Sequence, residues 1–175
     1  MKKHLTLLSL EFEDVTLDSI TADDLENLRR WKNANRLSFF HQAILSRADQ
    51  ANWFEGYLAR EQDWMFVVRT RGQAVGCMGF RMIDSQADVY NVILGNPSMG
   101  KRGLMSKAMR LMCSYIAAEH TRDIGAKVLR SNLAQAWYRK LGFREHAAHD
   151  TYVDLELDLH RFVFCKFQSR GVSAL

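Results

Sequence analysis

The chain has 175 residues, of which 47% are hydrophobic and 25% are charged. This balance excludes an intrinsically disordered chain, and the length allows one domain with a complete hydrophobic core. The net charge of +4 is a mild excess that suits a small polyanionic ligand. Because the basic residues are spread along the sequence, a nucleic-acid-binding stripe is disfavoured.

Neither a leader segment nor a membrane span is indicated by the sequence. The apolar run near the start ends at Glu11, which is too short for a signal-peptide core with its cleavage site. No stretch approaches the roughly 20 apolar residues that a membrane span needs. We therefore expect a cytoplasmic protein without membrane contact. Buried free thiols, and no metal or redox pair, are expected from the spacing of Cys77, Cys113 and Cys165.

The chain begins with a strand pattern, and two helix patterns follow it. Residues 4–19 carry the apolar residues of a strand. Thr21, with Asp24 three residues later, resembles a helix start, and Ser46 with Asp49 repeats this signal. Amphipathic apolar stripes follow both signals, which predicts two helices packed on a core.

Three strand patterns occupy the middle of the chain. They lie at residues 64–70, 74–84 and 87–94. Because only short turns separate them, we expect an antiparallel meander. Gly76 and Gly79 within the second strand predict a bulge or a close approach of another backbone.

The second half of the chain alternates between helix and strand patterns. A loop, a helix, a strand, a second helix and strand signals are expected at residues 95–103, 104–119, 126–129, 134–141 and 143–167. The second helix ends at Gly142, a typical C-terminal glycine. The strands on either side of the first helix should be parallel. Since no linker or repeat divides residues 1–175, we expect one α/β domain with a mixed sheet.

The tail over residues 152–167 holds more apolar side chains than an exposed edge strand usually does. They are Val153, Leu155, Leu157, Leu159, Phe162, Phe164 and Phe167. A second copy of the chain could cover this surface, so a homodimer is an open expectation.

A basic loop with two glycines precedes the helix at 104–119. Gly100 and Gly103 allow the backbone to approach a ligand, and the helix start supplies unpaired N–H groups at the positive end of its dipole. With Lys101 and Arg102 at its mouth, such a loop suits a pyrophosphate. An ordinary turn would show the same pattern, and the P-loop and G-x-G-x-x-G motifs are absent.

A second segment lies about 30 residues further on and runs from Ser131 to Phe143. It resembles the pattern N-x-x-A-x-x-x-Y-x-x-x-G-F, and the basic loop resembles R/Q-x-x-G-x-G/A with Gly103 as its first glycine. Both patterns belong to the GCN5-related N-acetyltransferase (GNAT) superfamily, and the resemblance covers roughly residues 15–160. Departures from the family patterns occur at Gly100, Met105 and Ser131.

The resemblance implies a mostly antiparallel central sheet with a splayed parallel pair and helices on both faces. It implies acetyl-CoA as co-substrate, with its pantetheine arm along Ile93, Leu94 and Gly95 and its pyrophosphate at the amides from Gly100 to Ser106. The cofactor-binding residues so implied are Ile93, Leu94, Gly95, Gly100, Lys101, Arg102, Gly103, Leu104, Met105, Ser106, Ser131, Asn132, Ala134 and Tyr138.

The implied reaction is direct attack of a neutral amine on the thioester. An alkyl amine with a pKa near 10 must first lose a proton, and the departing thiolate benefits from a donor. Tyr138 matches the position of that donor in the family, although a tyrosine that only packs against the cofactor would look the same. For the base we rank His41 first, and it is possible that no strong base exists. The other candidates are Asp88, Tyr90, Asn91, His146 and His149.

The acceptor amine is indicated only by residues 28–54. The segment Trp31-Lys32-Asn33, then Ile44 to Ser46 and Trp53-Phe54, resembles the branch that acetylates nucleotide-linked amino sugars. A related branch that acetylates protein N-termini, including those of ribosomal proteins, carries a similar W-x-N segment. Small amines, and a CoA-binding regulatory module without turnover, remain as alternatives. The aromatic residues would also fit an ordinary core.

Overall fold

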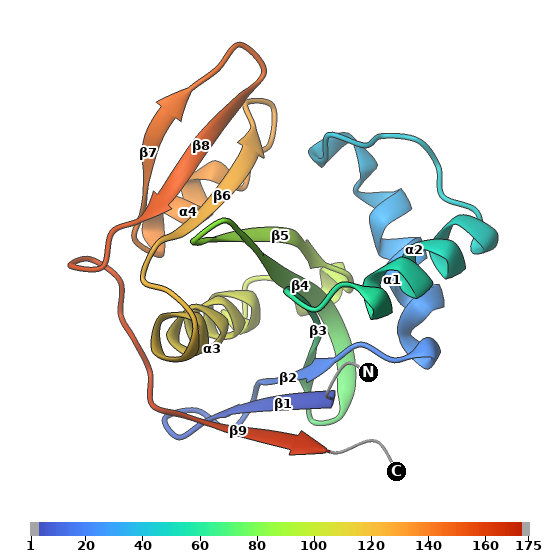
Figure 1. The fold of residues 1–175 in the computed structure, drawn as a ribbon, viewed down its shortest axis with the longest axis horizontal. Coiled ribbons are helices and arrows are strands. Elements are labelled where there is room, and N and C mark those ends of the chain that lie inside the picture. The colour runs from blue at the N-terminus through green and yellow to red at the C-terminus, as the bar shows by residue number, and fades with distance from the viewer. Residues whose placement is uncertain (1–3, 173–175) are drawn as a thin grey trace.

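One sheet forms the body of the computed structural model, which describes residues 4–172 (Figure 1). Its nine strands are ordered β7-β8-β6-β5-β4-β3-β2-β1-β9. They span β1 His4–Ser9, β2 Thr16–Ser19, β3 Asp63–Thr70, β4 Gln73–Ile83, β5 Gln86–Leu94, β6 Ile124–Leu129, β7 Phe143–Ala148, β8 Tyr152–Leu157 and β9 Phe167–Val172. The predicted strand at 4–19 is thus two strands, and the meander is confirmed as β3, β4 and β5.

The strands β5 and β6 are the one parallel pair among the described residues. Their pairing runs only from Ala87 opposite Ile124 to Val89 opposite Ala126. Beyond Val89, β5 continues to Leu94 without a partner on this side. The predicted mixed sheet, mostly antiparallel with a splayed parallel pair, is confirmed.

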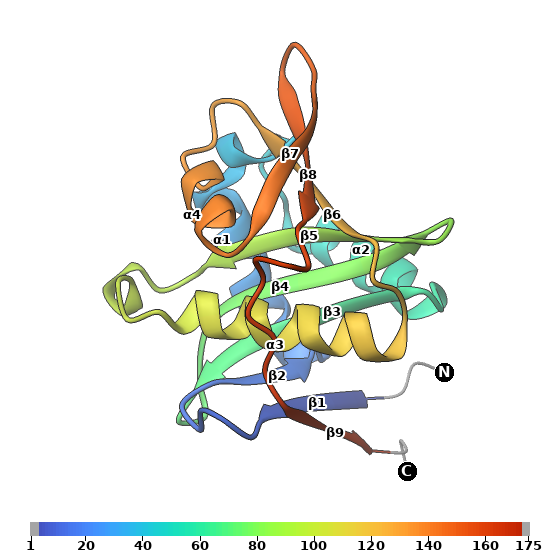
Figure 2. The ribbon, with the colours of Figure 1, turned by 90° about the vertical axis from the view of Figure 1, so that its left-hand side faces the viewer.

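Helices cover both faces of the sheet, as Figure 2 shows. The helices are η1 Ala22–Asp24, α1 Leu25–Ala34, η2 Arg36–Ser38, α2 Arg47–Ala59, η3 Pro97–Met99, α3 Leu104–Glu119 and α4 Gln135–Lys140. Side chains of α3 form a core with Phe66 and Phe80. Those of α1 and α2 form a second core with Val67, Cys77 and Ile93 on the opposite face, because successive strand residues point to opposite sides.

The helix start expected at Thr21 is the start of η1, which leads directly into α1, and the start expected at Ser46 is confirmed as that of α2. The backbone N–H of Thr21 donates to Asp24 Oδ2 at 3.0 Å, and the N–H of Ser46 donates to Asp49 Oδ2 at 2.8 Å. The N–H of Asp49 in turn donates to Ser46 Oγ at 3.1 Å. These contacts satisfy backbone donors that a helix start otherwise leaves unpaired.

A β-bulge in the middle of the sheet confirms the expectation for Gly76 and Gly79. The register between β4 and β5 shifts between Cys77 and Gly79. A Cβ on Gly79 would lie 2.5 Å from the carbonyl oxygen of Trp64. Opposite the shift, Asn91 has a positive φ of 50°. The bulge therefore sits where β5 leaves β6.

The chain itself buries much of the apolar tail, whereas Phe164 stays exposed, and the homodimer remains an expectation. The strand β8 lies between β6 and β7, and Val153, Leu155, Leu157 and Phe162 are buried. All three cysteines are buried and free, as predicted. Within residues 4–172, none of the helices has the length and apolar character that a membrane crossing requires.

The contact of Trp31 with Gly95 fixes α1 on the end of β5. A Cβ on Gly95 would lie 2.1 Å from the Trp31 ring. We expect Gly95→Ala to lower the free energy of unfolding by about 1–3 kcal/mol, because the added methyl group overpacks this contact. As a control, Gly56→Ala in α2 should be neutral or stabilise by up to about 1 kcal/mol. Urea unfolding measures both, and an unchanged midpoint for Gly95→Ala would contradict this packing.

Candidate active site

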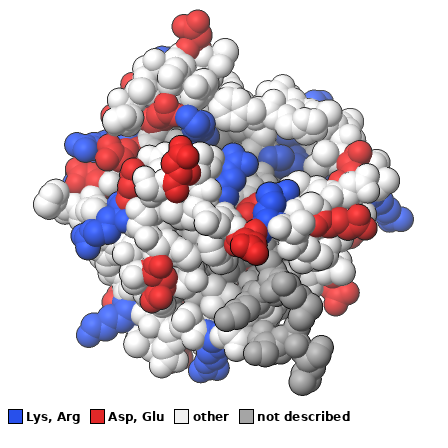
Figure 3. Space-filling model, in the orientation of Figure 1, with Lys and Arg blue, Asp and Glu red and all other residues white. Residues whose placement is uncertain are grey.

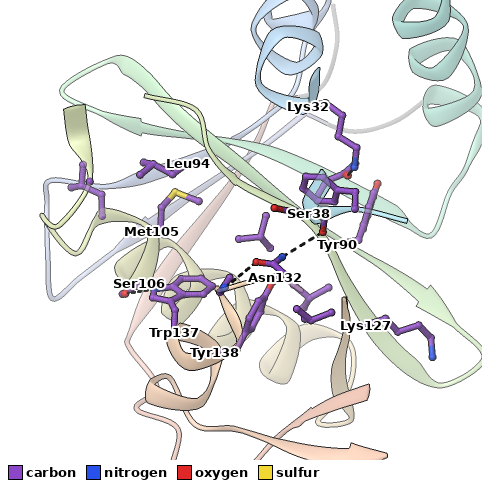
Figure 4. A pocket seen from close by; sticks show the side chains of 18 of the residues that line it. Lys32, Ser38, Tyr90, Leu94, Met105, Ser106, Lys127, Asn132, Trp137 and Tyr138 are labelled. Atoms are coloured by element: carbon purple, nitrogen blue, oxygen red, sulfur yellow. Dashed lines mark hydrogen bonds between the residues drawn. The ribbon is translucent and has the colours of Figure 1, made fainter. Parts of the chain in front are cut away.

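The divergence of β5 from β6 opens a cavity of about 780 Å³. Its walls come from β5, β6, the start of α3, α4, and the segment between α1 and α2. Figure 4 shows Met105 and Ser106 at one end, Lys32 and Tyr90 at the other, and Tyr138 with Asn132 between them. In Figure 3, Lys and Arg side chains gather around the hollow between the lobe of β6–β8 and that of α1 and α2.

The start of α3 forms the first end of the cavity. Gly103 caps the helix with a φ of 72°, which favours glycine. Within the described chain, the backbone N–H groups of Leu104, Met105 and Ser106 donate to no protein acceptor. A Cβ on Gly103 would meet nothing within 4 Å. Open space, unpaired amides and the positive helix end together suit an anion such as a diphosphate.

Tyr138 of α4 lies at the middle of the cavity. Its ring packs edge-on against Trp137 and Phe143, with centroids at 5.0 and 5.3 Å. Trp137 donates from Nε1 to Ser106 Oγ at 2.9 Å, which fixes α4 to the start of α3. The Tyr138 hydroxyl makes no hydrogen bond within residues 4–172. Burial raises the pKa of Tyr138, so the hydroxyl stays protonated near neutral pH and can donate a proton.

The segment between α1 and α2 closes the cavity by two contacts with the opposite lobe. Asn132 donates from Nδ2 to the carbonyl oxygen of Ser38 at 3.4 Å. Its Oδ1 accepts from the N–H of Ala134 at 2.9 Å, which fixes the start of α4. Phe40 packs edge-on against Tyr152 of β8, with ring centroids at 5.4 Å.

Lys32 projects from α1 into the far end of the cavity. Its Nζ donates to Asn91 Oδ1 at 2.6 Å and lies 3.3 Å from the centroid of the Phe39 ring. Burial lowers the pKa of Lys32 to about 8. No carboxylate of the described residues forms an ion pair with it. The cavity therefore holds a partly buried cation whose only polar partner in the described chain is a neutral amide.

Two other polar groups at this end are engaged by neighbours. Asp88 accepts from Arg81 Nε at 2.9 Å, and burial raises the pKa of its carboxyl. Tyr90 donates its hydroxyl hydrogen to Asp63, a buried carboxylate that also accepts from Arg60. By contrast, the exposed His41 lines the cavity and makes no hydrogen bond within residues 4–172.

Most of the residues implied by the family resemblance lie along the cavity. They are His41, Leu94, Gly100, Lys101, Gly103, Leu104, Met105, Ser106, Asn132, Ala134 and Tyr138. Ile93 is buried in the second core, Gly95 is covered by Trp31, and Arg102 and Ser131 are exposed outside the lining. The base candidates Asp88, Tyr90 and Asn91 line the cavity.

The histidines His146 and His149 do not reach the cavity, because β7 and β8 carry them away from it. His149 bonds Asp154 at 2.7 Å and stacks on Tyr152. His146 lies 3.3 Å from Glu156 in a separate recess. No group of three or more His, Cys, Asp or Glu side chains within residues 4–172 is arranged to hold a metal ion.

Sequence reasoning missed the contribution of α1 to the site. In the sequence, the Trp31-Lys32-Asn33 segment indicates only a resemblance to a family pattern. Asn33 donates from Nδ2 to the Leu45 carbonyl at 2.9 Å and accepts from the Leu45 N–H at 2.8 Å. It thereby fixes the segment that carries Phe39 to His41. Charged positions within an amphipathic helix were the available signal, but periodicity alone does not say which of them faces a cavity.

Several solved structures with a similar fold are acetyltransferases, and their acceptors differ. Apo FdhC, a nucleotide-linked sugar GNAT, has a TM-score of 0.72 at 13% identity, over 85% of this chain and 88% of that one. A Salmonella typhimurium acetyltransferase that modifies the N-terminal serine of a 50S ribosomal protein has a TM-score of 0.68 at 14% identity, over 95% and 99%. Spermidine N-acetyltransferase from Vibrio cholerae, in complex with CoA and spermine, has a TM-score of 0.68 at 18% identity, over 82% and 92%.

The sequence comparison adds the family. A search among curated proteins found no match at the sequence level. The family model described as an acetyltransferase (GNAT) domain matches residues 14–144, which include α1, α2, α3, the splayed strands and α4. The chain therefore belongs to the GNAT family and is an acetyl-CoA-dependent N-acetyltransferase.

Proposed function

We propose that this protein transfers an acetyl group from acetyl-CoA to the primary amine of a nucleotide-linked amino sugar. The observation that carries the proposal is the charge of the acceptor end of the cavity. Lys32, Arg81 and Lys127 line it together with one carboxylate, Asp88, which is paired with Arg81. Because Lys32 has no carboxylate partner in the described chain, this end favours an acceptor that carries negative charge, such as a diphosphate.

The opposite end supports acetyl-CoA as the co-substrate. The amides of Leu104 to Ser106 and the open space at Gly103 would hold its pyrophosphate. The unpaired edge of β5 beyond Val89 would accept backbone-like hydrogen bonds from the pantetheine arm. Lys101, exposed at this end, adds positive charge.

Proton transfer in the proposed reaction uses two residues that line the cavity. Tyr138 would donate its hydroxyl proton to the departing thiolate, since burial keeps it protonated. His41 would take the proton of the attacking amine, directly or through a water molecule. Unlike Arg81 and Tyr90, His41 neither pairs with a carboxylate nor donates a hydrogen bond within residues 4–172.

The other acceptors are less well supported by this charge distribution. A polyamine would bring several positive charges to Lys32 and Arg81, which are already cationic, and like charges at short range are unfavourable. A peptide N-terminus needs no anion site unless its sequence is acidic. The structurally similar FdhC is a nucleotide-linked sugar GNAT, which agrees with the proposed acceptor class.

The anion site at α3 is tested with a matched pair of glycine variants. Gly103 and Gly72 have positive φ values of 72° and 78°, and an added Cβ would meet nothing within 4 Å at either position. Alanine should therefore strain both sites alike, by about 1–2 kcal/mol. We expect Gly103→Ala to weaken coenzyme A binding about tenfold, because one charge-assisted amide contact is worth about 1.5–3 kcal/mol. Gly72→Ala should leave it unchanged in calorimetry, and equal losses would contradict the assignment.

Proton transfer is tested in steady-state kinetics. We expect Tyr138→Phe to lower kcat by about 10²–10⁴-fold with little change in the KM for acetyl-CoA, because only the proton donor is removed. His41→Asn should lower kcat by at least about tenfold near pH 7. Tyr115→Phe and His160→Asn are controls that remove the same groups outside the cavity. Wild-type turnover by Tyr138→Phe would refute the donor role.

The acceptor class is tested by release of CoA thiol with a panel of amines. The panel contains UDP-linked amino sugars, the free amino sugars, an acidic and a neutral peptide, and spermidine. We expect the nucleotide-linked sugars to react with at least about tenfold higher kcat/KM than the free sugars, because a bidentate or charge-assisted anion contact is worth more than 1.4 kcal/mol. Preference for spermidine would exclude this acceptor, and no release with any amine would favour a regulatory CoA-binding module.

A further inference from the structure

Lys32 differs from the other lysines of the cavity in its surroundings. Among the described residues, Lys32, Lys101 and Lys127 line the cavity. Lys127 forms an ion pair with Asp154 at 2.6 Å, and this hydrogen bond raises its pKa. Lys101 is exposed. Lys32 alone of the three is held inside by a neutral partner, Asn91 Oδ1, and so lacks a negative charge that would keep its proton in place.

The position of Lys32 is fixed at the point where the parallel strands separate. Its partner Asn91 occupies the bulge of β5, two residues beyond the last pair, Val89 with Ala126. The Nζ also lies over the ring of Phe39, 3.3 Å from its centroid. In Figure 4, the Lys32 side chain extends from α1 toward the part of the cavity that Tyr138 and Asn132 line. A thioester in the gap between the strands would face this amine.

The chemistry of Nζ also differs from that of an ordinary lysine. Burial lowers the pKa of Lys32 to about 8, and the electrostatic influence of the buried Cys77 opposes this shift only in part. Near pH 7 roughly a tenth of the Lys32 side chains are therefore neutral, against fewer than about one in a thousand for an exposed lysine. A neutral amine is the form that attacks a thioester.

We propose that Lys32 is itself an acetyl acceptor, which the enzyme acetylates when no external amine occupies the cavity. The inference rests on the proposed function, since acetyl-CoA must be bound first. Nζ attacks the thioester carbonyl carbon, an N–C bond forms, and the C–S bond breaks with its electron pair on sulfur. One proton of Nζ passes to the thiolate, directly or through the Tyr138 hydroxyl. The products are acetylated Lys32 and free CoA thiol.

This modification would prevent the acceptor end of the cavity from binding an anionic acceptor. Acetylation removes the positive charge of Lys32 and adds a bulky neutral group. The amide that results can no longer attract the anionic part of an acceptor. Conversely, an anionic acceptor bound at Lys32 favours its charged form and so protects it. The state of Lys32 therefore reports whether acetyl-CoA or the acceptor is in excess.

The test is incubation of the full chain with acetyl-CoA and no amine, followed by peptide mass spectrometry. We expect one acetyl group on Lys32, at a rate independent of protein concentration and at least about tenfold above the rates at Lys101 and Lys127. Lys32→Arg should abolish the modification in this peptide, whereas Lys127→Arg should not change it. Tyr138→Phe should slow it, and a reactive UDP-linked amino sugar should suppress it.

Calorimetry with acetyl-CoA distinguishes failure of the Lys32 inference from failure of the proposed function. If acetyl-CoA binds, amines release CoA, and Lys32 stays unmodified, the inference fails and the proposed function stands. Equal acetylation of Lys32 and Lys101, or equal rates in urea-unfolded chain, would show ordinary chemical reactivity and would also overturn it. If acetyl-CoA does not bind, both fail together.

Discussion

The separation of β5 from β6 is the constraint on which the rest of the site depends. Parallel pairing stops at Val89 and Ala126, and the bulge at Asn91 turns β5 away. Because no strand fills the gap, one edge of β5 keeps unpaired backbone groups beside a cavity in the middle of the sheet. The start of α3, the ring of Tyr138 and the side chain of Lys32 all converge on this gap from different elements. Closing it would remove the anion site and the acceptor site together.

The charge of the cavity serves binding and chemistry by the same electrostatic effect. The positive end of α3 and the cations at the opposite end attract anions to both ends of the cavity. The same cations disfavour the ammonium form of an amine that enters between them, and so lower its pKa. Deprotonation of the acceptor, which limits attack on a thioester near pH 7, is thereby made easier.

Local signals in the sequence predict the helices and strands, whereas packing between distant segments determines which residues line the cavity. The Thr21–Asp24 and Ser46–Asp49 pairs mark helix starts through contacts within one turn, so the sequence alone identifies them. Gly103 was likewise predicted from a local pattern, a glycine directly before a helix, and the structure adds that its φ is positive. His146 and His149 are polar and close in sequence to α4, but the course of β7 and β8 takes them elsewhere. Their true position depends on strand pairing between distant residues, which no local pattern encodes.

The Trp31-Lys32-Asn33 segment shows how a short pattern acquires a physical meaning once the fold is known. Trp31 covers Gly95 and holds α1 on β5, while Asn33 exchanges two hydrogen bonds with Leu45 and holds the segment that carries Phe39 to His41. Between these two anchors, Lys32 is kept in the cavity against the cost of its own burial. Because Asn91 offers Lys32 only a neutral partner, the contacts of Trp31 and Asn33 on either side are needed to hold this buried cation in place. Trp31 and Asn33 thus position Lys32, which lies between them in the sequence.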